Sequence, residues 1–162
     1  MMEPIAERQG ALTDMDLFAD ARRSKGRVLL GGLNAPGAPG APGAADMDVA
    51  ARVLRDASYE VVHLGAGHAA TAVAAAAIDE DVDAVVVWDD SNAARERLLD
   101  HILGVRACLD DDAVEVPVLV CAIGRDTAEI AAITEAGVTV VVALDALDDA
   151  LAAQVAGRRR QM

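Results

Sequence analysis

The fold of this chain is decided by residues 83–88, which read Asp83-Ala-Val-Val-Val-Trp88. Every residue after the aspartate is apolar, and the three consecutive valines are β-branched. A run of this length and composition is typical of a strand that is buried on both sides. Such a strand belongs in the middle of a parallel sheet, so the flanking segments must supply more strands and the helices that cover them.

The flanking segments repeat a strand followed by a helix. We predict strands at residues 28–30, 59–64, 83–88, 116–122 and 138–143, and helices at residues 46–57, 69–80, 126–136 and 146–156, with another helix running from the cap Asp89-Asp90-Ser91 to about residue 109. Five such units indicate an α/β fold of the flavodoxin-like (Rossmann-like) type. We therefore expect a five-stranded parallel sheet in the order 2-1-3-4-5, with helices on both faces.

The units form one domain over residues 25–158. Residues 1–24 precede it as an N-terminal arm, in which Thr13 can cap a short helix over residues 14–23. Residues 159–162 follow as a tail, and the arginines at 158–160 are expected to be solvated.

Composition excludes two classes of partner. The net charge is −13, and the only basic runs lie at residues 22–27 and 158–160, so a nucleic-acid groove is not expected. No apolar run reaches the length of a membrane span, and residues 1–10 lack the apolar core of a secretory signal. Cys108 and Cys121 have neither a CxxC spacing nor a histidine cluster beside them, so we interpret them as buried free thiols of a cytoplasmic protein.

In a sheet of this order, ligands bind beyond the carboxyl ends of the strands. The residues expected there, and hence the candidate cofactor-binding residues, are Asn34, Gly43, Asp89, Ser91 and Gly124. We predict no catalytic residue and no metal ligand. Helix capping is the preferred role of Asp89-Asp90-Ser91. The alternative is the phosphorylated aspartate of a receiver domain, but the acidic pair and the lysine that such a site needs are missing.

Other familiar motifs are absent. The turn after the first strand, Gly31-Gly32-Leu-Asn-Ala-Pro36, does not fit the GxGxxG of a dinucleotide site, and no P-loop is present. His63 and His101 have no second ligand three or four residues away.

A resemblance to a known family rests on four stretches of scaffold. They are GRVLL at 26–30, VAARVLRDASYEVVHLG at 49–65, AAAIDEDVDAVVV at 75–87 and ITEAGVTV at 133–140. Together they resemble the cobalamin-binding domain of adenosylcobalamin-dependent mutases, methylmalonyl-CoA mutase above all. In that family a loop motif Asp-x-His-x-x-Gly supplies the histidine that binds cobalt, and a separate barrel binds the acyl-CoA substrate.

The chain departs from the family pattern at three loops. Ala41, Gly43 and Asp46 stand where the aspartate, histidine and glycine of the ligand motif belong. Trp88-Asp89-Asp90 replaces Ser-x-Leu after the third strand, and residues 121–124 replace the paired glycines after the fourth. The resemblance therefore implies a domain that has lost its cobalt ligand and whose slot for the nucleotide tail is narrowed by side chains.

Three functions follow from these patterns. The leading hypothesis is a non-catalytic interaction module without a cofactor, bound to the large subunit of a mutase or to a second copy of itself. The alternative is a functional cobalamin-binding small subunit of such an isomerase, with the cofactor's own base on cobalt or with His68 as the ligand. A receiver-like signalling domain is the third.

Overall fold

The structure is a computed structural model that describes residues 24–33, 43–89 and 95–161. Its strands are β1 (Arg27–Gly32), β2 (Glu60–Ala66), β3 (Ala84–Asp89), β4 (Val118–Ala122) and β5 (Thr139–Val141). Its helices are α2 (Gly43–Asp56), α3 (Ala70–Asp79), α4 (Arg95–Asp111), α5 (Thr127–Glu135), a 3-10 turn η1 (Leu144–Ala146) and α6 (Leu147–Gln161). The predicted helix at 14–23 lies outside the described residues.

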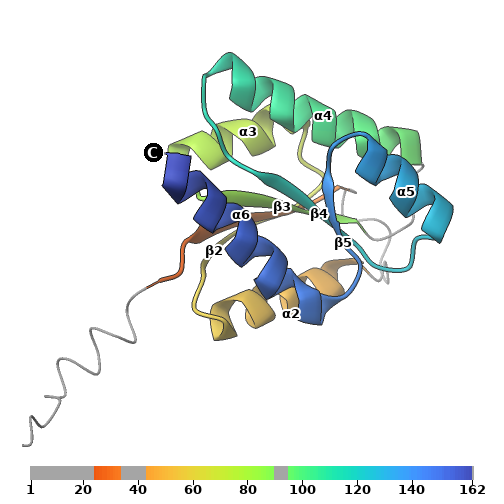
Figure 1. The fold of residues 1–162 in the computed structure, drawn as a ribbon, viewed down its shortest axis with the longest axis horizontal. Coiled ribbons are helices and arrows are strands. Elements are labelled where there is room, and N and C mark those ends of the chain that lie inside the picture. The colour runs from red at the N-terminus through yellow and green to blue at the C-terminus, as the bar shows by residue number, and fades with distance from the viewer. Residues whose placement is uncertain (1–23, 34–42, 90–94, 162) are drawn as a thin grey trace, which may run out of the picture.

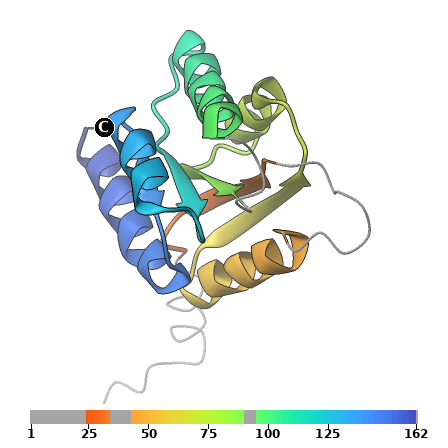
Figure 2. The ribbon, with the colours of Figure 1, turned by 90° about the vertical axis from the view of Figure 1, so that its right-hand side faces the viewer.

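The five strands form one parallel sheet in the order β2-β1-β3-β4-β5, which confirms the predicted fold. Helices α3, α4 and α5 cover one face, and α2 and α6 cover the other (Figure 1). β3 is buried along its whole length between β1 and β4, as the valine run predicts. Because all strands run the same way, their carboxyl ends share one edge, which Figure 2 views from the front.

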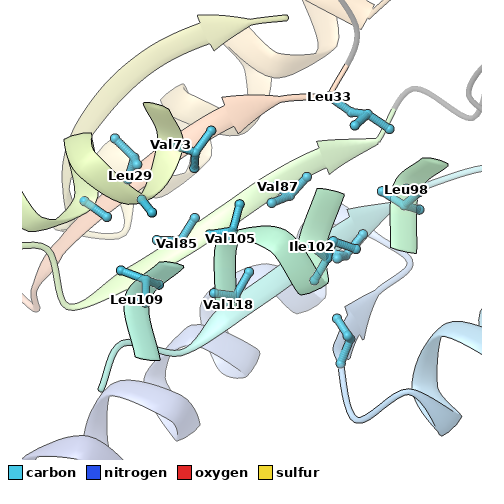
Figure 3. Close-up of a cluster of buried hydrophobic side chains, with 14 of the residues drawn as sticks. Leu29, Leu33, Val73, Val85, Val87, Leu98, Ile102, Val105, Leu109 and Val118 are labelled. Atoms are coloured by element: carbon cyan, nitrogen blue, oxygen red, sulfur yellow. The ribbon is translucent and has the colours of Figure 1, made fainter. Parts of the chain in front are cut away.

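Two apolar cores lie on the two faces of the sheet. Side chains of β3 alternate between them, with Val85 and Val87 on the α3–α4 side (Figure 3) and Val86 and Trp88 on the α2–α6 side. This alternation follows from the two-residue repeat of a strand. As a result, Trp88 and Asp89 face opposite layers of the protein although they are adjacent in sequence.

Several element boundaries differ from the predicted ones for local reasons. β4 begins at Val118 rather than at residue 116, because Pro117 has no N–H and takes part only through its carbonyl oxygen, which accepts from Val85 N over 2.9 Å. α5 is capped by Asp126, whose carboxylate accepts from Glu129 N over 2.8 Å, and the helix ends before Gly137 at a φ of +81°. Both ends of α5 agree with the prediction to within one residue.

The last helix is longer than predicted. α6 continues to Gln161, so residues 159–161 of the expected tail are helical. Arg158 is not a solvated end residue: its Nη1 donates to Val82 O over 3.1 Å and lies 3.4 Å from the Asp83 carboxylate. The prediction failed because α6 passes the start of β3, a contact between segments 75 residues apart in sequence.

Candidate functional site

The predicted site residues are distributed unevenly at the carboxyl edge of the sheet. Asp89 is the last residue of β3, Gly124 lies in the loop between β4 and α5, and Gly43 is the first residue of α2. Asn34 and Ser91 lie outside the described residues. The structure places Asp89 next to the loop that carries Gly124, because Asp89 pairs with Ala122 in the sheet register.

A buried ion pair closes this part of the edge. Nε and Nη2 of Arg125 donate to the two carboxylate oxygens of Asp89, the second over 2.9 Å. The Asp89 and Arg125 side chains are 0% and 2% exposed. Two parallel N–H···O bonds between a guanidinium and a carboxylate fix both groups in one orientation. Asp89 is therefore engaged with the loop after β4.

This pair gives Asp89 a partner that the sequence interpretation did not include. The Asp89 carboxylate accepts from Arg125, and the residues between Asp89 and Arg95 lie outside the described ranges, so the capping role stays a prediction. The 0% exposure of the Asp89 side chain and its pairing with Arg125 argue against the receiver-domain alternative for this residue. Asp90 lies outside the described residues.

The sequence places Ile123-Gly124-Arg125 at the carboxyl edge of the sheet, but it does not predict that Arg125 pairs with Asp89. The backbone of Arg125 follows Gly124, which has a φ of +89°, a conformation that glycine adopts without strain. The turn at Gly124 brings the arginine back over the end of β3. Glu129, one helical turn into α5, lies 3.5 Å from Arg125 Nη1 and supports it from the other side.

Trp88 fills the opposite layer at the same level of the sheet. It is 4% exposed and packs in the core that contains Met47, Cys121 and Leu147. Its carbonyl oxygen accepts from Leu33 N over 3.1 Å, which holds the start of the loop after β1. The indole Nε1 has no hydrogen-bond partner, the one such buried side-chain atom found in the described part of the chain. An unpaired buried donor is unfavourable, so this nitrogen marks an imperfect fit.

Two histidines near this edge have defined tautomers. Gly65 N donates to His63 Nδ1 over 3.2 Å, so Nε2 carries the proton and donates to Asp48 over 3.1 Å. His68 lies in the β2–α3 loop, and its Nε2 donates to Leu64 O over 2.9 Å, since a carbonyl oxygen can only accept. Nε2 of His68 is therefore engaged by the backbone, and Nδ1 has no hydrogen bond within the described residues, while both nitrogens of His63 are engaged.

The remaining candidate groups are His101 and the two cysteines. His101 on α4 is half-buried, and this burial, with a smaller contribution from Arg97, lowers its pKa. Burial, followed by the nearby Asp89 charge, raises the pKa of the Cys121 thiol to about 12. Cys108 and Cys121 are both free, as predicted, although Cys108 is only half-buried. Residues 24–33, 43–89 and 95–161 contain no group of three or more acidic, histidine or cysteine side chains placed to hold a metal ion.

Comparisons with known proteins identify the fold. No protein-family model matches the sequence, and no curated protein matches it. Among solved structures, a chain of the methanol:cobalamin methyltransferase complex MtaBC from Methanosarcina barkeri is similar, with a TM-score of 0.61 and 17% identity. The similarity covers 83% of this chain and 48% of that chain. At this identity the comparison establishes a shared fold, and the present chain spans about half the length of its neighbour.

The helices also bear on membrane insertion. None of the described helices combines the length and the apolarity that are needed to cross a bilayer.

Proposed function

We propose that this chain is a non-catalytic subunit with the fold of a cobalamin-binding domain, whose ligand slot is occupied by its own side chains. It docks on the large subunit of an adenosylcobalamin-dependent acyl-CoA mutase or on a second copy of itself. The main support is that buried side chains fill the carboxyl edge of the sheet. Trp88 lies on one face, and the Asp89–Arg125 pair lies on the other. The fold neighbour, a cobalamin methyltransferase complex, supports a corrinoid-related assembly.

The residues at this edge do not fit a cobalamin. By sequence count, Ala41, Gly43 and Asp46 stand at the positions of the cobalt-binding loop motif, so neither the histidine nor its carboxylate is supplied there. Opening the slot would expose a buried indole and separate a buried ion pair. Removing one partner from such a pair costs about 3–5 kcal/mol. A nucleotide tail would have to recover this free energy in addition to its own binding cost.

Apolar side chains around the closed edge support a docking role. Ile123 and Val142 are exposed, at 37% and 50%. They follow residues 121 and 141, which are paired in neighbouring strands, so they lie on the same stretch of the edge. Exposed aliphatic side chains beside a rigid ion pair suit a protein partner better than a polar small molecule.

The test is an absorbance titration of the purified chain with adenosylcobalamin and with hydroxocobalamin. The proposal expects no saturable spectral change with the wild-type chain. Saturable binding with a histidine-on spectrum, or with the cofactor's own base on cobalt, would refute the closed-slot proposal. The same titration is carried out with Trp88→Ser, which removes the indole from the proposed ligand slot, for comparison with the wild-type chain.

Docking needs a measurement of its own. The chain is mixed with the purified large subunit of the mutase from the same source, and complex formation is measured by light scattering after gel filtration. We expect either this complex or a dimer of the chain alone. Val142→Asp should weaken the complex, whereas Ala131→Asp, at an exposed position in the middle of α5, should not. A monomer that ignores the large subunit would contradict docking while leaving the titration result intact.

A second candidate function rests on His68. Its Nε2 donates to a backbone carbonyl oxygen, as the second ring nitrogen of a metal-binding histidine commonly does, which leaves Nδ1 as the nitrogen that would bind cobalt. A functional cobalamin subunit using this residue would lose its histidine-on spectrum in His68→Ala and keep it in His63→Ala. The same spectrum in both variants would exclude His68 as the ligand.

A further inference from the structure

A groove of about 400 Å³ lies at the amino edge of the sheet, at the opposite end from the candidate functional site. Its walls are the last turns of α4 and α6, and its base is formed by the starts of β4 and β5. Small-molecule sites typically have volumes of roughly 300–1,000 Å³. The groove is therefore large enough for a small ligand, and nothing in the proposed function uses it.

Two arginines enter the groove from opposite walls. Arg106 on α4 donates from Nη1 to Gly137 O over 3.3 Å, and Arg158 on α6 donates from Nη1 to Val82 O over 3.1 Å. Nη1 of each guanidinium thus donates to a backbone carbonyl oxygen. Arg158 is also 3.4 Å from the Asp83 carboxylate, but Arg106 has no ion pair with any residue of the described ranges. Arg106 thus gives the groove a positive charge that no carboxylate of the described ranges pairs with, although Asp110 and Glu115 are also among the lining residues.

A hydroxyl adds a further donor. Gln154 Nε2 donates to Thr139 Oγ1 over 3.2 Å, so the hydroxyl oxygen already accepts and its proton is left to donate. Thr139 and Gln154 both line the groove, whose walls are α4 with Arg106 and α6 with Arg158. A set made of two guanidinium groups and a hydroxyl donor suits the oxygens of a carboxylate.

The rest of the lining limits the body of the ligand. Leu109, Val116 and Val118 supply apolar contacts at the base of the groove, within a lining that is otherwise largely polar. Asp110 and Glu115 also line the groove, and their charges oppose a second negative charge on a ligand. The lining therefore favours one carboxylate on a short aliphatic chain over a dianion.

We propose that this groove binds a short-chain aliphatic monocarboxylate. Its carboxylate lies between Arg106 and Arg158 and accepts from Thr139, and its alkyl chain contacts the apolar base. The site is independent of cobalamin, because it lies at the other edge of the sheet.

The experiment is a titration of the full ¹⁵N-labelled chain with sodium butyrate, followed by the amide shifts in ¹H–¹⁵N NMR spectra. n-Butylammonium chloride at the same ionic strength is the control ligand, since it has the same alkyl chain and the opposite charge. We expect saturable shifts at Val116, Gly137 and Thr139 with butyrate only. Amides at the carboxyl edge, such as Gly67 and Gly124, should not move.

Two variants test the arginine role. Arg106→Gln keeps a hydrogen-bond donor but removes the charge, and should raise the Kd for butyrate at least about tenfold, as expected for a lost charged hydrogen bond. Arg97→Gln, on an exposed position of the same helix outside the groove, should leave the Kd unchanged. The unperturbed spectrum of each variant verifies folding. Shifts that do not saturate, that are equal with butylammonium, or that persist in Arg106→Gln would overturn the proposal.

Discussion

The guanidinium of Arg125 binds the carboxylate of Asp89 through two N–H groups, across 36 residues of sequence and with both side chains shielded from water. The pair joins the end of β3 to the loop after β4. In the proposed function this pair fills part of the ligand slot, so the same two side chains would affect both stability and ligand binding.

Removing one member of this pair should destabilise the protein strongly. Arg125→Ala removes the guanidinium that balances the buried Asp89 charge, and we expect a loss of about 3–5 kcal/mol in the free energy of unfolding. The double variant Asp89→Leu/Arg125→Leu leaves no buried charge and should lose less than Arg125→Ala. Urea unfolding followed by circular dichroism measures both. A double variant less stable than the single one would show that the pair contributes net stability.

The unpaired indole nitrogen of Trp88 makes a second prediction. Trp88→Phe keeps an aromatic ring in the core and removes the unsatisfied Nε1 donor. Phenylalanine is smaller than tryptophan, so the variant loses buried apolar area but no longer buries an unpaired donor. Because these two effects oppose each other, we expect the free energy of unfolding to change by no more than about 1.5 kcal/mol. Trp88→Ala leaves a cavity and should cost about 3–5 kcal/mol. Thermal unfolding of the two variants tests this; a loss with phenylalanine as large as with alanine would mean that the indole nitrogen has a partner in solution.

The buried thiol of Cys121 predicts a pH dependence of stability. Its pKa is raised from an ordinary value of 9.0 to about 12, chiefly by burial. The folded protein thus keeps the thiol proton at a pH where the unfolded chain releases it, so this contribution to stability is complete below pH 9 and declines as the pH rises towards 12. Urea midpoints of the wild type and Cys121→Ala, measured from neutral pH up to the ordinary thiol pKa of 9.0 and beyond it, should show the steeper decline in the wild type. Parallel profiles would contradict the assigned cause.

Two glycines offer a matched test of packing. Gly157 is helical, and a Cβ there would meet nothing within 4 Å, so Gly157→Ala should stabilise the protein by roughly 0.5–1 kcal/mol. A Cβ on Gly32 would lie 2.9 Å from the Ala66 Cβ, which cannot rotate away, so Gly32→Ala should cost roughly 1–3 kcal/mol. Differential scanning calorimetry of both variants gives the sign. A stabilising Gly32→Ala would show that β1 and β2 can separate at their ends.

Much of the fold could be predicted because its causes are local. The valine run of β3 specified a buried central strand, and Asp126 and Gly137 specified the two ends of α5. The candidate site was less accessible to prediction. Asp89 lies at the predicted edge of the sheet, but its ion pair with Arg125, which follows the next strand, was not predicted.

The sequence by itself determined which segments form strands and helices, their order in the sheet, and the lack of a nucleotide or cobalt-binding motif. These follow from residue periodicity, capping residues and motif spacing, which act over a few neighbouring positions. Only the tertiary structure decided that Arg125 binds Asp89, that Arg106 and Arg158 face one groove, and that His68 presents Nδ1. Contacts of this kind depend on strand register and on the path of each loop, because they join groups that the chain brings together only after it has folded.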